Sequence, residues 1–314
     1  EMKGAYSDPE EILQHEIMKS LYPDTCYSQE SGGHPEHICE LSREAFLDFH
    51  QTYYHPSNAF IYLYGDMDME EKLNWLDQEY LSTYEALKVD SEIQHQEPFE
   101  TSVEKTVFFP LPSSESEEDN AIISYNLVMG DSLDKEMYIA ISILNYALFN
   151  APGARVKKEL LDAKIGKEIH AEYDTSLKQP LFSIVVKGTQ ASKKDEFISI
   201  IQHTIKDLIQ KGISKEAIEA GLNSSEFKYR EADFGQFPKG LFYCIQSMDS
   251  WLYNENEPFV HIDSLDTYAF LREKIGTDYY EQILEKYFVQ NHHCSVVMME
   301  PKKGLNALAD EKLE

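Results

Sequence analysis

The sequence has few cysteines, no long apolar run and a shortage of basic residues, and each shortage argues against a class of protein. Its four cysteines are scattered and form no Cys-x-x-Cys pair, which argues against a cysteine zinc site. Sparse, unpatterned cysteines suit a reducing compartment. No apolar run approaches the ~18 residues of a membrane span. The 314 residues are enough for about two domains.

The charge of the chain is strongly negative. Its 56 acidic and 28 basic side chains give a net charge of −28. Because phosphate binding needs clustered cations, nucleic acid is not expected as a partner, and neither is an anionic membrane surface. The acidity is compatible with attraction of cationic peptides, although it is more commonly a means of keeping a surface soluble.

Apolar periodicity and turn residues predict the order of the elements. A linker without usable periodicity is expected at residues 89–102 and marks a domain boundary. Helices are expected at residues 8–21, 42–55, 70–84 and 134–150, with two more after the candidate caps Ser192 and Ser214. Strands are expected at residues 59–65, 103–111, 120–129, 167–174, 181–188 and 294–299.

Two of the predicted helices have a clear apolar stripe. The helix after Ser42 is expected to bury Phe46, Phe49 and Tyr53. The helix after Ser192 is expected to bury the stripe formed by Phe197, Ile198, Ile201, Ile205 and Leu208. Helices and strands interleave without the rhythm of a parallel βαβ fold. The predicted class is therefore α+β, in which helices cover a mostly antiparallel sheet as two-layer sandwiches.

A set of short motifs, in a shared order along nearly the whole chain, resembles one peptidase group. These motifs are Glu1–Ser7, Asp24–His37 with its Ser31-Gly32-Gly33, Tyr53–Ala59, Tyr64-Gly65-Asp66, Gln179–Ile184, Glu226–Glu231 and Phe237–Leu241. Together they resemble the inverted-zincin metallopeptidases of the pitrilysin and insulysin clan, in the presequence-protease branch. The resemblance implies domains of the LuxS/pitrilysin-like type.

The resemblance also implies a zinc site, of which this chain holds one part. In the family, two histidines of an H-x-x-E-H motif and a glutamate from a later helix hold Zn²⁺, and the motif glutamate is the catalytic base. By resemblance, Glu1 matches the later ligand. No histidine of this chain is followed four residues later by another. We therefore expect the base and both histidines to lie upstream, no catalytic residue within this chain, and no zinc binding by the chain alone.

Two neighbouring sequence features suggest weaker site assignments. Gly32 and Gly33 could line the substrate cleft, although paired glycines more often mark a turn. The histidines of His34-Pro35-Glu36-His37 are three residues apart rather than four, so this segment is interpreted as a solvated loop.

The resemblance divides the chain into four parts. Residues 1–88 would be the C-terminal part of the catalytic domain, residues 89–102 the linker, residues 103–303 a second, non-catalytic peptidase-like domain, and residues 304–314 the start of a helical linker. Its partners would be unstructured peptide substrates and the remaining N-terminal and C-terminal parts of the same polypeptide. A bacterial cytoplasm is favoured over an organellar matrix.

The functional hypothesis is a section of a zinc metallo-endopeptidase that degrades short unfolded peptides and is inactive by itself. A catalytically dead family member that binds peptides or acts as a scaffold is the alternative. A stand-alone structural domain is a third hypothesis. The residues upstream of Glu1 would separate the first two, because an intact H-x-x-E-H motif favours the enzyme.

Overall fold

A five-stranded mixed sheet forms the centre of the computed structural model, which describes residue 4, residues 7–232 and residues 235–313. The strand order is β1-β5-β2-β4-β3. The strands are β1 (Val103–Leu111), β2 (Ala121–Val128), β3 (Glu168–Asp174), β4 (Leu181–Thr189) and β5 (Cys294–Lys303). All five match strands expected from the sequence.

The closing strand β5 enters the middle of the sheet. It runs parallel to β1, with Val103 opposite Ser295, and antiparallel to β2, with Ile122 opposite Met299. The β2–β4 and β3–β4 pairings are also antiparallel. Strands β1 and β2 are joined by an acidic loop at residues 113–119 but are not neighbours in the sheet. Because three of the four pairings are antiparallel, the predicted mostly antiparallel α+β class is confirmed.

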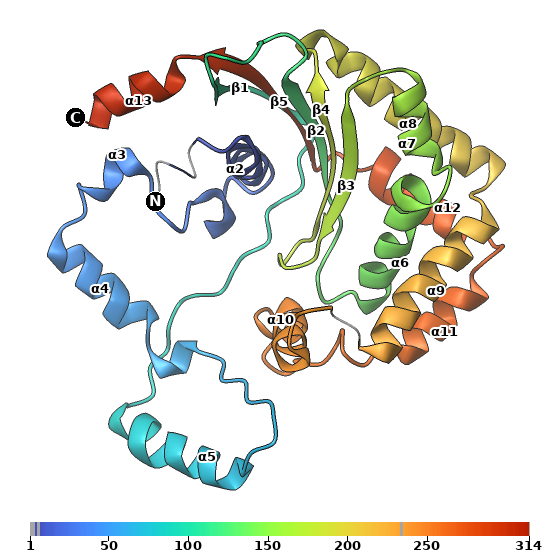
Figure 1. Cartoon of the computed structure of the whole chain (residues 1–314). Helices are drawn as coiled ribbons and strands as arrows, with labels where there is room; N and C mark the ends of the chain where they lie inside the picture. Colours follow the sequence, from blue (N-terminus) through green and yellow to red (C-terminus); the bar gives the residue numbers. More distant parts are fainter. Residues whose placement is uncertain (1–3, 5–6, 233–234, 314) are drawn as a thin grey trace.

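One face of the sheet is covered by a layer of helices (Figure 1). The helices are α6 (Lys135–Asn145), α7 (Arg155–Asp162), α8 (Lys194–Lys211), α9 (Lys215–Glu231), α11 (Leu265–Glu273) and α12 (Tyr279–Leu284). Their apolar side chains and the sheet form the larger core cluster, in which Phe182, Phe197 and Leu222 are fully buried. Burial of this apolar surface is the main stabilising term of the fold.

The other face of the sheet is covered by α2 (Pro9–Leu21), which lies on the concave side of the sheet in Figure 1. Its apolar stripe, Leu13, Ile17 and Leu21, packs in the second core cluster with strand residues such as Val297. Lys105 of β1 and Lys187 of β4 form ion pairs with Glu16 and Glu10 of α2. Every residue of β2 is consequently buried, because both faces of the sheet are covered.

A separate segment, residues 23–88, extends away from the sheet and is here called the arm (Figure 1). It contains α3 (Pro35–Ile38), α4 (Arg43–Tyr53) and α5 (Met69–Trp75), the last continuing into a π-helical turn at Leu76–Tyr80. Residues 89–102 lead from the arm to β1 without helix or strand. We call residues 103–303 the sheet domain. The predicted four-part division of the chain stays a prediction.

Three local expectations about the arm and its neighbours are wrong. Residues 59–65 form no strand, because no other described segment pairs with their backbone groups. Phe46 and Phe49 are 62% and 59% exposed rather than buried. Ser192 does not cap α8, which begins at Lys194 after a 3₁₀ turn and has no side-chain cap.

The remaining elements lie beside or beyond the sheet. Helix α10 (Lys239–Trp251) stands between the arm and the helix layer (Figure 1). Helix α13 (Leu305–Leu313) follows β5 where a helical linker was expected to begin. Within the described residues, no helix is both long and apolar enough to cross a membrane.

Candidate functional site

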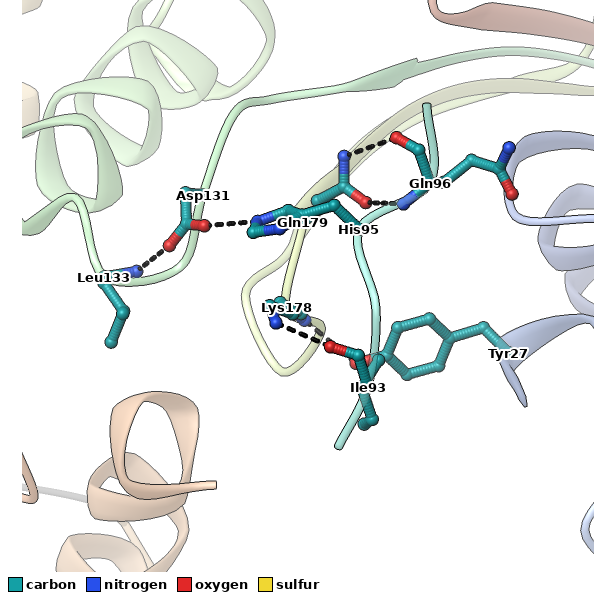
Figure 2. Close-up of polar contacts among 8 residues, drawn as sticks. All are labelled: Tyr27, Ile93, His95, Gln96, Asp131, Leu133, Lys178 and Gln179. Atoms are coloured by element: carbon teal, nitrogen blue, oxygen red, sulfur yellow. Dashed lines mark hydrogen bonds and ion pairs between the residues drawn. The ribbon is translucent and has the colours of Figure 1, made fainter. Parts of the chain in front are cut away.

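The junction between the arm and the sheet domain is built on the turn that joins β3 to β4. Tyr27 of the arm accepts a hydrogen bond from the backbone N–H of Lys178 in this turn (2.9 Å). The ammonium of Lys178 donates to the backbone carbonyl of Ile93 (2.5 Å). Figure 2 shows the two contacts, which both run from Lys178 to the same side of the turn. The turn thus holds the arm and the linker at the same place.

The linker is held by two hydrogen bonds between the side-chain amide of Gln179 and the backbone of Gln96. The side chain of Gln179 accepts from the backbone N–H of Gln96 (2.6 Å) and donates to its carbonyl (3.1 Å), as a neighbouring strand would (Figure 2). The Gln96 side chain is buried and exchanges two hydrogen bonds with Asp24 (2.9 and 2.8 Å). His95 contacts Asp131 of the sheet domain at 2.6 Å. These bonds satisfy buried polar groups and fix the linker on the turn.

A second polar cluster fixes α10 against the sheet domain. Asp249 of α10 accepts hydrogen bonds from the hydroxyls of Tyr138 (2.9 Å) and Thr175 (3.1 Å). The ring of His261 stacks on Tyr138 with 3.7 Å between centroids. Burial raises the pKa of Asp249 to about 6, against the smaller opposing effect of these hydrogen bonds. Burial lowers the pKa of His261 to about 4, so its ring is neutral at pH 7. Since both groups are buried, the cluster is suited to positioning rather than proton transfer.

Aromatic contacts complete the junction. The ring of Phe60 in the arm lies 4.6 Å from that of Trp251 in α10, and the hydroxyls of Tyr27 and Tyr253 are 3.0 Å apart. A Cβ at Gly240 would collide with the ring of Tyr64, so glycine is required for this close approach. Residues 59–65, which form no strand, are therefore placed by side chains on α10.

The arm presents an uncovered apolar surface. None of residues 23–88 is buried. The exposed large side chains come from α4, from α5 and from the segment between them; they include Phe46, Leu47, Phe49, Tyr53, Phe60, Ile61, Leu73 and Trp75. Large apolar side chains that stay exposed on several elements of one segment are typical of an interaction surface.

Of the site residues expected from the sequence, the structure describes Gly32 and Gly33. Glu1 lies outside the described residues. Gly32 and Gly33 belong to an exposed turn, in which Gly33 donates to the carbonyl of Glu30 (3.2 Å) and has a φ of +77°. Glu30 in turn faces His15 of α2 (3.7 Å). A substrate-binding role for this glycine pair stays a prediction.

The segment His34-Pro35-Glu36-His37 forms the one-turn helix α3 rather than a loop. The His34 ring caps it by accepting from the backbone N–H of Glu36 (3.2 Å), and His37 pairs with Glu40 (3.1 Å). Across the described residues, no three histidine, cysteine or acidic side chains come together as a metal site would require.

The positioning residues of the junction were not found from the sequence. Gln96 and Gln179 lie 83 positions apart, and Tyr138 and Asp249 lie 111 apart. No local pattern links such pairs, and His261 stands in no motif that indicates its role. Trp251 carries a usable signal, because large aromatic residues commonly pack in a core or between domains.

Comparison with known proteins gives consistent matches. A family model described as "Peptidase M16 inactive domain" matches residues 40–225. Protein HypA of Clostridium perfringens is 41% identical over the whole chain, which covers 32% of that protein. The chloroplastic and mitochondrial presequence protease 1 of Arabidopsis thaliana is 31% identical over 99% of the chain and is covered to 30%. The chain thus spans about a third of the length of these relatives.

A solved structure shows the same fold at low identity. The crystal structure of a protease from Helicobacter pylori superposes with a TM-score of 0.70 at 14% identity. The superposition covers 94% of this chain and 67% of the other.

Proposed function

Because the chain belongs to the peptidase M16 inactive-domain family, we propose that it is a section of a zinc metallo-endopeptidase that degrades short, unfolded peptides. By itself the section cleaves nothing. Support comes from a relative named as a presequence protease and from the share of about a third that the chain occupies in its relatives.

The observation that carries this proposal is the uncovered arm. Helix α4 is capped by Ser42, which accepts from the backbone N–H of Ala45 (3.1 Å). Its Phe46 and Phe49 nevertheless have no core to enter. A formed helix with an open apolar face is what remains when its packing partner lies elsewhere. In our proposal that partner is the remaining part of the same polypeptide.

Zinc belongs to the longer polypeptide in this proposal. The described residues do not fit a zinc ion, because zinc sites need three protein ligands and no such group is present among them. We therefore assign no catalytic step to these residues. We propose that Glu1 supplies one ligand in the intact protein and that the Gly32-Gly33 turn contacts substrate. A bacterial cytoplasm is the proposed compartment, in keeping with the Clostridium perfringens relative.

The test is to extend the chain at both ends to the length of its relatives. The extended polypeptide should cleave an unstructured peptide and lose this activity with a chelator, whereas the 314-residue chain should show none. Glu1→Gln in the extended form should lose bound zinc and turnover together, and retained zinc would refute the ligand role. Chelator-sensitive cleavage by the 314-residue chain would contradict the proposal.

Peptide binding without cleavage by the extended form would instead favour the catalytically dead scaffold protein.

A further inference from the structure

A cavity of about 530 Å³ lies between the arm, the end of α9, α10 and the loop that precedes α11. This volume is typical of small-ligand pockets. Its lining combines tyrosines and apolar side chains with a single guanidinium: Tyr62, Tyr229, Tyr243, Phe259, Leu265 and Arg230 are among its residues. Tyr62, from the segment 59–65 of the junction, lines this cavity, whereas the polar junction residues Gln96, Gln179 and Asp249 do not.

The walls of the cavity are largely aromatic, and one of them, Tyr229, is held by hydrogen bonds. The hydroxyl of Tyr229 donates to the carbonyl of Ile262 (2.5 Å) and accepts from the backbone N–H of Ser264 (3.2 Å). Tyr62 of the arm, which also lines the cavity, stacks with Tyr64, and burial raises the pKa of the Tyr62 hydroxyl. Aromatic walls favour a large apolar side chain as the ligand group.

Arg230 supplies the charge of the cavity. Its Nε and one Nη contact Oε1 of Glu226 at 2.7 and 2.6 Å, while Arg272 binds Oε2 of the same carboxylate at 2.7 Å. The two guanidinium groups, Arg272 most strongly, hold the pKa of Glu226 below its usual range. The two guanidinium groups and the one carboxylate together carry a charge of about +1. A guanidinium also has more N–H donors than the two that contact Glu226, so Arg230 can still donate to a ligand.

The combination defines the ligand. A cation at the edge of an aromatic slot selects a carboxylate joined to an apolar side chain, because an Arg–carboxylate contact is directional and stronger than a neutral hydrogen bond. The chain as a whole is acidic, with a net charge of −28, so a local positive site of this kind is not part of a general basic surface. We infer that this cavity binds the C-terminal residue of a peptide, with its α-carboxylate on Arg230 and its side chain between the tyrosines.

This inference deepens the proposed function, from which it takes only the peptide class. The test needs no turnover, so its failure and the failure of the proposed catalytic role are distinguishable. Two N-acetylated hexapeptides without acidic residues, both ending in phenylalanine, are titrated calorimetrically into the 314-residue chain. One ends in a free carboxylate and the other in a carboxamide. The free acid should bind at least about tenfold more tightly. Equal affinities would overturn the inference.

Variants locate the effect. Arg230→Gln should bring the acid-to-amide affinity ratio close to one, whereas the matched control Lys228→Gln, an exposed cation in the same helix, should keep it. Arg230 is itself exposed, and Glu226 keeps Arg272 as a partner, so the substitution is compatible with folding. A ratio unchanged in Arg230→Gln would contradict the assignment. A second measurement needs no variant: the advantage of the free acid should shrink at high salt, and a salt-independent ratio would count against Arg230.

Discussion

Helices α4 and α8 have comparable apolar stripes but opposite surroundings. In α8 of the sheet domain, Phe197, Ile201 and Ile205 are buried against the sheet. In α4 of the arm, Phe46 and Phe49 are more than half exposed, although its cap is formed. The comparison teaches that an amphipathic pattern specifies which face of a helix will be covered, but not which segment covers it.

The largest expected effect is on stability. Phe197→Ala should lower the free energy of unfolding by about 3–5 kcal/mol, because a buried aromatic side chain leaves a cavity in the core. Phe46→Ala in the same chain should change it by less than about 0.5 kcal/mol, because an exposed side chain has little packing to lose. Urea unfolding of the two variants measures the difference. A cost of several kcal/mol for Phe46→Ala would show that α4 is covered within this chain.

Asp249 and His261, in the polar cluster at α10, should each change the free energy of unfolding by roughly 3 kcal/mol as pH changes. Asp249 has its pKa raised from 3.8 to about 6, so its stabilising contribution is present at low pH and is lost as pH rises through about 6. His261 has its pKa lowered from 6.5 to about 4, so its contribution is present above 6.5 and is lost as pH falls toward 4. The two slopes are opposite and nearly cancel in the unmodified chain.

Single variants should separate these two contributions. Asp249→Asn should make the chain less stable on acidification from pH 6.5 to about 4.5, whereas His261→Gln should make it more stable over the same interval. Urea unfolding at several pH values is the measurement. No titratable group of the arm is buried, so parallel pH profiles of the two variants would exclude this cluster as the source.

The smallest effect concerns the two helix caps. Ser214 accepts from the backbone N–H of Ala217 (3.2 Å) at the start of α9, and Ser42 caps α4 in the same way. Ser214→Ala should lower global stability by about 1 kcal/mol. Ser42→Ala should loosen α4 and leave global stability unchanged, because α4 is not part of the core. Equal losses in urea unfolding would contradict the difference between arm and sheet domain.

Much of the fold was predictable because its signals are local. All five strands and the caps Ser42 and Ser214 follow from β-branched runs and turn residues. The position of β5 between β1 and β2 was not predictable, because pairing joins segments almost two hundred residues apart. Residues 59–65 have strand composition but no strand, because a strand requires a neighbour to pair with.

The candidate sites were less predictable than the fold. The family resemblance pointed to Glu1 and the Gly32-Gly33 turn, which are proposed to bind zinc and substrate in the longer polypeptide. The paired hydrogen bonds between Gln96 and Gln179 and the cavity at Arg230 form only when elements distant in sequence meet. Gln179, Tyr229 and Arg230 fall within motifs of the family resemblance, but a motif does not show which distant residue each of them contacts.

The most direct test of the central claim is amide hydrogen exchange in α4. In our proposal, the rest of a longer polypeptide covers the apolar face of the arm. Exchange of the amides of Phe46–Tyr53 should therefore slow by at least about tenfold in the extended polypeptide relative to the 314-residue chain, with α8 as an unchanged reference. Equal exchange of α4 in the two forms would contradict the account.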